Sequence, residues 1–306
     1  MADRKTPDVL VLGAGGILGE AWTSSVLAGL AEADGFDPLA CDAYVGTSAG
    51  SIVAAMLCAG VDPRSRLDNL PEPPEVTESE QAQFSLLTRA IRAGASMSSA
   101  ATGPLASLVL HTTVPGGRLL RREALRRVRR GRRSLSQLGE EVERWGTAWD
   151  DRLRIAVVEL ETGRRVILDG SDPAFSVPEA VQASCAIPGV FRPIEHDGHS
   201  YVDGGAWSLT NLDVAPVGKG TEVLCLNPTG SLRSGRRDPL ALLGPMSRSI
   251  ASIEAAAVRR RGAKVRLVSP DDGASEAMGP NLMNPRRHGD VVAAGLAQGR
   301  RLAAGS

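Results

Sequence analysis

The sequence is poor in aromatic residues, histidine and cysteine, and it has no excess charge of either sign. Aromatic residues make up 3% of its 306 residues, and there are four histidines. Lysine and arginine together number 35, as do aspartate and glutamate, so no net charge attracts nucleic acid or an acidic surface. Few aromatic rings are available to stack on bases. We therefore expect no nucleic-acid partner.

The cysteines and the hydropathy exclude further classes. The four cysteines lie far apart without a Cys-x-x-Cys spacing, which predicts reduced, buried side chains rather than disulfides or a metal site. They are Cys41, Cys58, Cys185 and Cys225. No apolar run is long enough to cross a bilayer, and the first residues lack the apolar part of a secretion signal. The sequence favours a cytoplasmic protein, and peripheral contact with a membrane stays open.

Strand-like and helix-like segments alternate along the chain. Apolar runs at 9–12, 41–47, 155–160, 165–168, 222–226 and 264–268 predict strands, and helical periodicity follows several of them. This alternation predicts an α/β fold with a mostly parallel central sheet and helices on both faces. In the long helix near 243–257, the expected core face is Leu243, Met246, Ile250, Ile253 and Ala257.

We expect one domain over residues 1–306, with residues 61–150 as an insertion or cap. The proline-rich run at 70–75 begins this part of the chain, and residues 118–133 contain nine arginines. The segment 84–133 fits a lid or a membrane-binding element. The arginine run equally fits a solvated helix that pairs with the acidic residues at 140–143, and the balanced overall charge favours that interpretation.

A serine stands at the sharp turn between one predicted strand and its helix, in Gly46-Thr47-Ser48-Ala49-Gly50. A side chain at either flanking glycine would collide with the neighbouring elements. The positive end of the following helix favours an alkoxide or an oxyanion beside it, which suits a nucleophile. A tight packing turn is the competing interpretation of Ser48.

A glycine-rich loop and an aspartate accompany this serine. Gly13, Gly15, Gly16 and Gly19 follow the first strand, where several backbone N–H groups would bind an anion. A dinucleotide-binding loop or a simple tight turn fits the same residues, although the glycine spacing differs by one from the dinucleotide pattern. Asp203 ends another strand and is followed by two glycines, so the backbone that carries this carboxylate can approach another loop closely, and an ordinary turn aspartate is the competing interpretation.

With these motifs in order, the sequence resembles the patatin-like phospholipases, lipid acyl hydrolases that use a Ser-Asp dyad. The resemblance extends over nearly the whole chain and rests on four segments: Gly13-Ala14-Gly15-Gly16-Ile17-Leu18-Gly19, Gly46-Thr47-Ser48-Ala49-Gly50, the run from Ala183 to Phe191, and Asp203-Gly204-Gly205. The sequence departs from the family at Leu18, where a basic residue is usual.

The resemblance implies that Ser48 attacks an ester carbonyl and Asp203 takes its proton as general base. The backbone N–H groups of Gly15, Gly16 and Ile17 would form the oxyanion hole, without a metal or an organic cofactor. Two alternatives stay open. One is a triad esterase of Ser48, an aspartate and His288, and the other is a non-catalytic nucleotide-binding module on the loop Gly13 to Gly19. The sequence fixes neither the substrate beyond a lipid or ester nor the oligomeric state.

Overall fold

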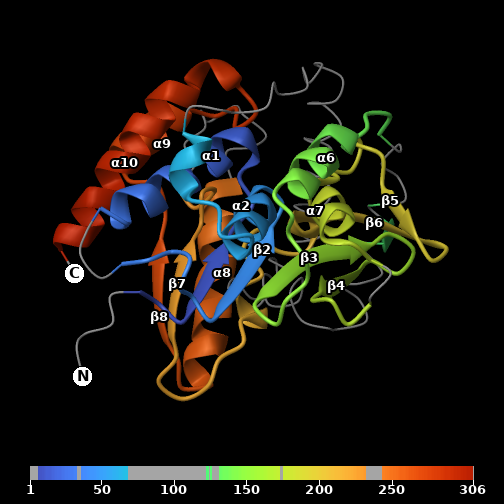
Figure 1. The fold of residues 1–306 in the computed structure, drawn as a ribbon, viewed down its shortest axis with the longest axis horizontal. Helices are drawn as coiled ribbons and strands as arrows, with labels where there is room; N and C mark the ends of the chain where they lie inside the picture. The colour runs from blue at the N-terminus through green and yellow to red at the C-terminus, as the bar shows by residue number, and fades with distance from the viewer. Residues whose placement is uncertain are drawn as a thin grey trace, which may run out of the picture.

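The computed structural model describes residues 6–32, 36–67, 122–123, 125, 131–172, 175–231 and 243–305. At its centre is one eight-stranded sheet, whose strands are labelled in Figure 1. The strands are β1 (Val9–Leu12), β2 (Ala43–Thr47), β3 (Leu153–Glu159), β4 (Arg164–Leu168), β5 (Ile194–His196), β6 (His199–Asp203), β7 (Glu222–Leu226) and β8 (Lys264–Val268).

The sheet is mixed and mostly parallel. Its order is β5-β6-β3-β2-β1-β7-β8, and β4 pairs with β3. Neighbouring strands among β3, β2, β1, β7 and β8 pair in parallel. The pairs of β4 with β3, β6 with β3 and β5 with β6 are antiparallel. The hairpins at these antiparallel strands turn through Gly163 and through Asp197-Gly198, which all have positive φ. Parallel strands without such turns are connected through helices instead.

Seven α-helices are described. They are α1 (Gly16–Leu30), α2 (Ala49–Cys58), α6 (Ser136–Arg144), α7 (Val177–Cys185), α8 (Leu243–Arg260), α9 (Asp272–Met278) and α10 (His288–Ala304). Short 3₁₀ turns lie at Pro63–Arg66, Gly204–Ala206, Leu212–Val214 and Pro285–Arg287. None of the helices in the described part of the chain is both long and apolar enough to cross a membrane.

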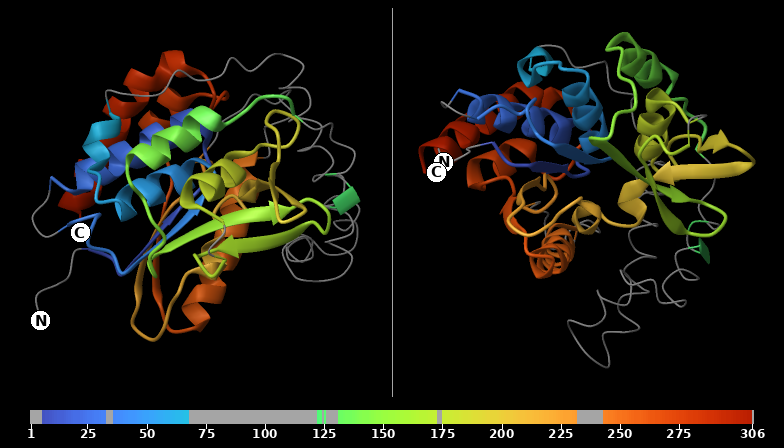
Figure 2. Two further views of the ribbon diagram at one scale, coloured as in Figure 1. Left: turned by 45° about the vertical axis from the view of Figure 1, so that its right-hand side comes forward. Right: turned by 60° about the horizontal axis from the view of Figure 1, so that its bottom comes forward.

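Two apolar clusters cover the two faces of the sheet. In β1, Leu10 and Leu12 pack into a cluster with side chains of α1, α2, α7 and α10, whereas Val9 and Val11 pack into a second cluster with α8. Figure 2 shows α8 on the opposite side of the sheet from α1 and α10. This alternation follows from the period of two in a strand. The predicted α/β fold with helices on both faces is therefore confirmed.

The predicted core face of the long helix is only partly right, because Ile250 is buried at 7% exposure and its other described members are not. Met246, Ile253 and Ala257 are only partly buried, whereas the polar Ser247 and Glu254 are 1% and 5% exposed. Both buried polar side chains are hydrogen-bonded: the Ser247 hydroxyl bonds to neighbours on the loop after β7, and the Glu254 carboxylate accepts from residues after β6. A rule that places only apolar side chains inward cannot predict a helix face held by hydrogen bonds.

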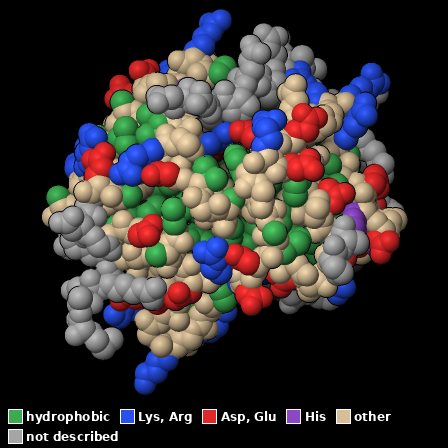
Figure 3. All heavy atoms as spheres, in the orientation of Figure 1, with side chains coloured by type: hydrophobic (Ala, Val, Ile, Leu, Met, Phe, Trp, Pro, Cys, Tyr) green, Lys and Arg blue, Asp and Glu red, His purple; other side chains and the backbone are tan. Residues whose placement is uncertain are grey.

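Most of the predicted cap, including nearly all of the segment 84–133, lies outside the described residues. The part that is described packs against the rest of the fold. In α6, Val142 is fully buried in the cluster that contains Leu10 and Leu12 of β1, and Glu141 forms an ion pair with Arg66. On the face drawn in Figure 3, apolar side chains lie in small groups between charged ones, as the balanced composition suggests.

Candidate active site

Two strands meet head to head along one edge of β3. The strand β2 runs parallel to β3 and ends with Thr47 opposite Ala156. The strand β6 runs antiparallel and ends with Asp203 opposite Val157. The strand β4 pairs with β3 both where β2 pairs with it and where β6 does. A strand has only two edges, so β2 and β6 share the edge that β4 leaves open. The residues at the ends of these strands, Ser48 and Asp203, are thereby brought together although they are far apart in sequence.

Ser48 has a strained backbone. It lies between β2 and α2 with φ of 52° and ψ of −124°, a conformation that residues other than glycine rarely adopt. Such strain costs about 1–3 kcal/mol and persists where the surrounding structure imposes it. Here the Ser48 N–H donates to the Ser184 hydroxyl at 2.9 Å, and the Ser48 carbonyl accepts from the Ser51 N–H and hydroxyl, each at 2.7 Å. These bonds fix the turn on both sides of the side chain.

The Ser48 hydroxyl lies beside the Asp203 carboxylate, close enough to lower the pKa of that carboxyl. Asp203 is 6% exposed, and its Oδ1 also accepts from the Gly205 N–H at 2.6 Å. Burial raises the pKa of Asp203 to about 6, against the opposing effects of the Ser48 hydroxyl and the Gly205 N–H. A carboxylate with this pKa is ionised at neutral pH and is a stronger base than an ordinary aspartate. The pair therefore has the contact that proton transfer from a serine requires.

The glycine-rich loop lies at the same end of the sheet. Its donors Gly13, Ala14, Leu18 and Gly19 are bonded to carbonyl oxygens at 2.7–3.0 Å. Among the described residues, none accepts a hydrogen bond from the N–H of Gly15, Gly16 or Ile17, which begin α1. Three backbone donors at a helix N-terminus are thus available to a ligand, and an oxyanion suits them. These are the three residues to which the family resemblance assigns the oxyanion hole.

Two glycines allow the three motifs to approach one another. A side chain at Gly50 would overlap the Leu12 carbonyl oxygen at the end of β1. A side chain at Gly205 would lie 2.9 Å from Asp203 Oδ1 and 3.7 Å from the side chain of Ala14 in the glycine-rich loop. The serine turn, the aspartate turn and the loop are therefore in direct contact, and glycine is needed where they meet.

The end of α7 forms another wall of the site. The Ser184 hydroxyl, which accepts from Ser48, itself donates to the Ala156 carbonyl at 2.8 Å. The neighbouring Cys185 thiol lies 3.9 Å from the Ser51 hydroxyl and close enough to Ser48 for that residue to influence its pKa. Burial raises the pKa of this thiol well above its usual value, so Cys185 is present as a neutral thiol. Neither residue is predicted as a site residue from sequence, although both belong to the segment that carries the family resemblance.

Leu18 occupies the position where the family usually has a basic residue. Its side chain is fully buried in the main apolar cluster, and its N–H donates to the Leu282 carbonyl at 3.0 Å. The segment around Leu282 also contacts the loop, because a side chain on Gly16 would lie 2.7 Å from the Met283 sulfur. The first turn of α1 is therefore held by a segment near the C-terminus, which no local sequence pattern indicates.

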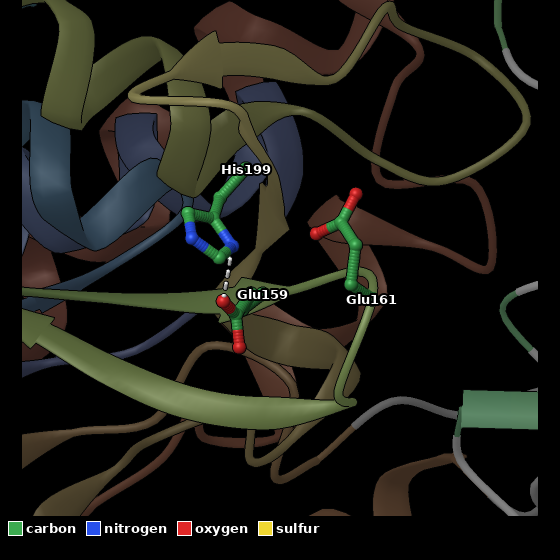
Figure 4. A group of neighbouring side chains, drawn as sticks. All are labelled: Glu159, Glu161 and His199. Carbon is green, nitrogen blue, oxygen red and sulfur yellow. Dashed lines mark ion pairs between the residues drawn. The ribbon is translucent and has the colours of Figure 1, made fainter.

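Two of the described histidines pair with carboxylates other than Asp203. His196 contacts Asp172 at 3.2 Å, and His199 contacts Glu159 at 2.7 Å. Figure 4 shows the second pair beside Glu161. The possible ligand atoms of these three residues all lie within 4.8 Å of one another. This spacing would suit a divalent cation, yet the ion pair already accounts for the contact.

His288, the residue proposed for a triad, is the first residue of α10. The groups that set the pKa of Asp203 are Ser48 and Gly205, besides burial itself, and no histidine of the described residues is among them. The described residues thus bring Ser48 and Asp203 together at the ends of β2 and β6.

The family model described as patatin-like phospholipase matches residues 10–216, which include the glycine-rich loop, Ser48 and Asp203. Comparison with solved structures finds VipD from Legionella pneumophila, with 15% identity, a TM-score of 0.40, and coverage of 98% of this chain and 67% of that one. It also finds the type III effector protein ExoU, with 16% identity, a TM-score of 0.37, and coverage of 98% and 53%. This chain thus spans about half of the ExoU chain. The comparison with curated proteins finds no match.

Proposed function

Because the chain belongs to the patatin-like phospholipase family, we propose that it hydrolyses carboxylic ester bonds of lipids, with Ser48 as nucleophile and Asp203 as general base. The family implies a lipid acyl hydrolase. The contact between the Ser48 hydroxyl and the buried Asp203 carboxylate is the observation that carries this proposal.

In the first half of the reaction, the Ser48 oxygen attacks the ester carbonyl carbon and its proton passes to Asp203. The N–H groups of Gly15, Gly16 and Ile17 would bind the oxygen that becomes negative, and one such donor contributes roughly 3 kcal/mol to transition-state stabilisation. The tetrahedral intermediate then expels the alcohol, which takes the proton from Asp203. The acyl group remains on Ser48 as an ester.

In the second half, a water molecule replaces the alcohol. Asp203 takes a proton from the water, the resulting hydroxide attacks the acyl carbonyl, and Ser48 leaves and regains its proton from Asp203. No step needs a metal or an organic cofactor. The raised pKa of Asp203 favours both proton transfers, because a base of higher pKa holds the transferred proton more strongly.

The proposed substrate is an acyl ester of a lipid, presented at a membrane surface or as a dispersed monomer. All four cysteines are free thiols, which fits a reducing compartment such as the cytoplasm. We expect peripheral contact with a membrane surface while the ester is bound. The glycines that flank the reacting groups, including Gly46 and Gly204, serve the close packing of the turns rather than the chemistry.

The test combines an activity-based fluorophosphonate probe with a panel of phospholipids and simple acyl esters. Wild type should be labelled and should hydrolyse at least one ester, whereas Ser48→Ala and Asp203→Asn should do neither at a measurable rate. His288→Ala should keep most activity, and a large loss in that variant would replace the dyad with a triad. If wild type is not labelled and a dinucleotide raises its melting temperature, a nucleotide-binding module is the better description.

A further inference from the structure

Asn211 spans the junction where β2 and β6 meet. Its side chain is fully buried, and its Nδ2 lies 3.1 Å from Thr47 Oγ1, 3.5 Å from the Gly204 carbonyl and 2.7 Å from the Ser208 carbonyl. Thr47 immediately precedes Ser48, and Gly204 immediately follows Asp203. One amide group therefore contacts both turns that hold the reacting side chains.

The orientation of this amide is determined by its other neighbour. Asn211 Oδ1 accepts from Arg165 Nη1 at 3.1 Å, and a guanidinium group can only donate. The amide oxygen must face Arg165, so the amide nitrogen must face Thr47 and Gly204. Arg165 is itself fixed by Asp213, at 2.6 and 2.7 Å. A flipped amide would place Nδ2 against a cation and is excluded.

The backbone of Asn211 is also held in place. It has a left-handed conformation with φ of 49° and ψ of 33°. On either side, the Glu254 carboxylate accepts from the Thr210 hydroxyl at 2.6 Å and from the Leu212 N–H at 2.9 Å. Glu254 is 5% exposed and lies on α8, which covers the face of the sheet opposite to α1 and α10. A rigid helix thus fixes the short segment that carries Asn211.

We propose that Asn211 is a positioning residue, which sets the separation between the Ser48 oxygen and the Asp203 carboxylate by binding the ends of both strands. This inference rests on the proposed function of the Ser48 and Asp203 pair. Asn211 does not touch the reacting atoms and acts through Thr47 and Gly204. Proton transfer is sensitive to the distance between donor and acceptor, so a small separation of the two turns slows acylation strongly.

The test is Asn211→Gly, because glycine adopts the left-handed backbone easily and loses only the side chain. The matched control is Asp197→Gly, which removes an exposed side chain at another left-handed position, in the turn between β5 and β6. We expect the fluorophosphonate labelling rate and kcat for a soluble ester to fall at least tenfold in Asn211→Gly. KM should stay within twofold, and the control should match wild type.

Two further readouts separate positioning from a purely structural role. Because the nearby Ser48 hydroxyl lowers the pKa of Asp203, a looser pair should shift the midpoint of the labelling rate to higher pH. Thr47→Val removes one acceptor of Asn211 without changing side-chain size much. It should lower the rate in the wild-type background and have no further effect in Asn211→Gly. Thr47→Val alone carries the test if Asn211→Gly does not fold.

The outcomes distinguish this inference from the proposed function. If wild type is labelled and Asn211→Gly is labelled at the same rate with the same pH midpoint, the positioning role is wrong and the proposed function stands. Independent, multiplicative effects of Thr47→Val and Asn211→Gly would also overturn it. If wild type is not labelled at all, the proposed function fails, and Asn211 has no reaction to serve.

Discussion

Replacing Asp203 by asparagine should remove activity and, at the same time, stabilise the fold at neutral and alkaline pH. Burial raises the pKa of Asp203 from 3.8 to about 6. A folded-state pKa above the unfolded value means that the folded state binds the proton more tightly. The contribution of Asp203 to the free energy of unfolding is therefore largest at low pH, and it is lost as the pH rises from the unfolded pKa to the folded one.

The magnitude follows from the size of the shift. A difference of about two units corresponds to about 3 kcal/mol of free energy of unfolding, and all of it is lost above about pH 6. Asparagine carries no charge, so it avoids this loss, and its amide oxygen can still accept from the Gly205 N–H. The variant should be more stable than wild type by about 3 kcal/mol at pH 8 and by less than about 1 kcal/mol at pH 4.

The assay is urea unfolding of wild type and Asp203→Asn at both pH values, followed by circular dichroism. Because every other titrating group is present in both proteins, its contribution cancels in the difference. A gain of equal size at pH 4 and pH 8 would point to packing rather than charge. No gain at pH 8 would refute the assignment of Asp203 as a buried, ionised base.

Three further predictions concern the same region. The value of kcat/KM for a soluble ester should rise about tenfold per pH unit below pH 6 and level off above it, since the base must be ionised, and a flat profile would contradict this. Gly50→Ala should destabilise the protein by about 3 kcal/mol in thermal unfolding, because the added carbon overlaps β1, whereas Gly218→Ala, with open space around it, should have little effect. Arg66→Met should lower the free energy of urea unfolding by about 3–5 kcal/mol, because it leaves the buried Glu20 without its cation. The exposed control Arg64→Met should cost less than about 1 kcal/mol, and equal losses in the two arginine variants would show that burial of the ion pair is unimportant.

Much of the fold follows from local sequence patterns. The apolar runs at 9–12 and 222–226 become adjacent parallel strands, and those at 155–160 and 165–168 become the antiparallel pair β3 and β4. Such patterns depend on neighbours in the chain, so one sequence is enough to find them. Strand order and register depend on distant pairing, and the head-to-head meeting of β2 and β6 is not visible in either strand alone.

In the candidate site, too, some residues are recognisable from the local sequence and others only from distant contacts. Ser48 and Asp203 stand out because each lies between a strand and glycines, whereas Ser184 and Asn211 act through hydrogen bonds to residues far away in sequence. Glu254 is the clearest omission. A carboxylate on a helix is normally assigned to the solvent face, yet burial raises its pKa to about 7 and its Oε2 accepts from the segment around Asn211. Only the three-dimensional structure reveals such partners.

The junction on β3 also bears on how activity appears during folding. Ala156 and Val157 are consecutive residues, and each must pair with a different strand before Ser48 and Asp203 can meet. Both pairings join segments distant in the chain, and such contacts form slowly because long loops must close first. Neither half of the sheet alone would contain a reactive serine. Recovery of labelling after dilution from denaturant would therefore mark completion of the sheet rather than its first collapse.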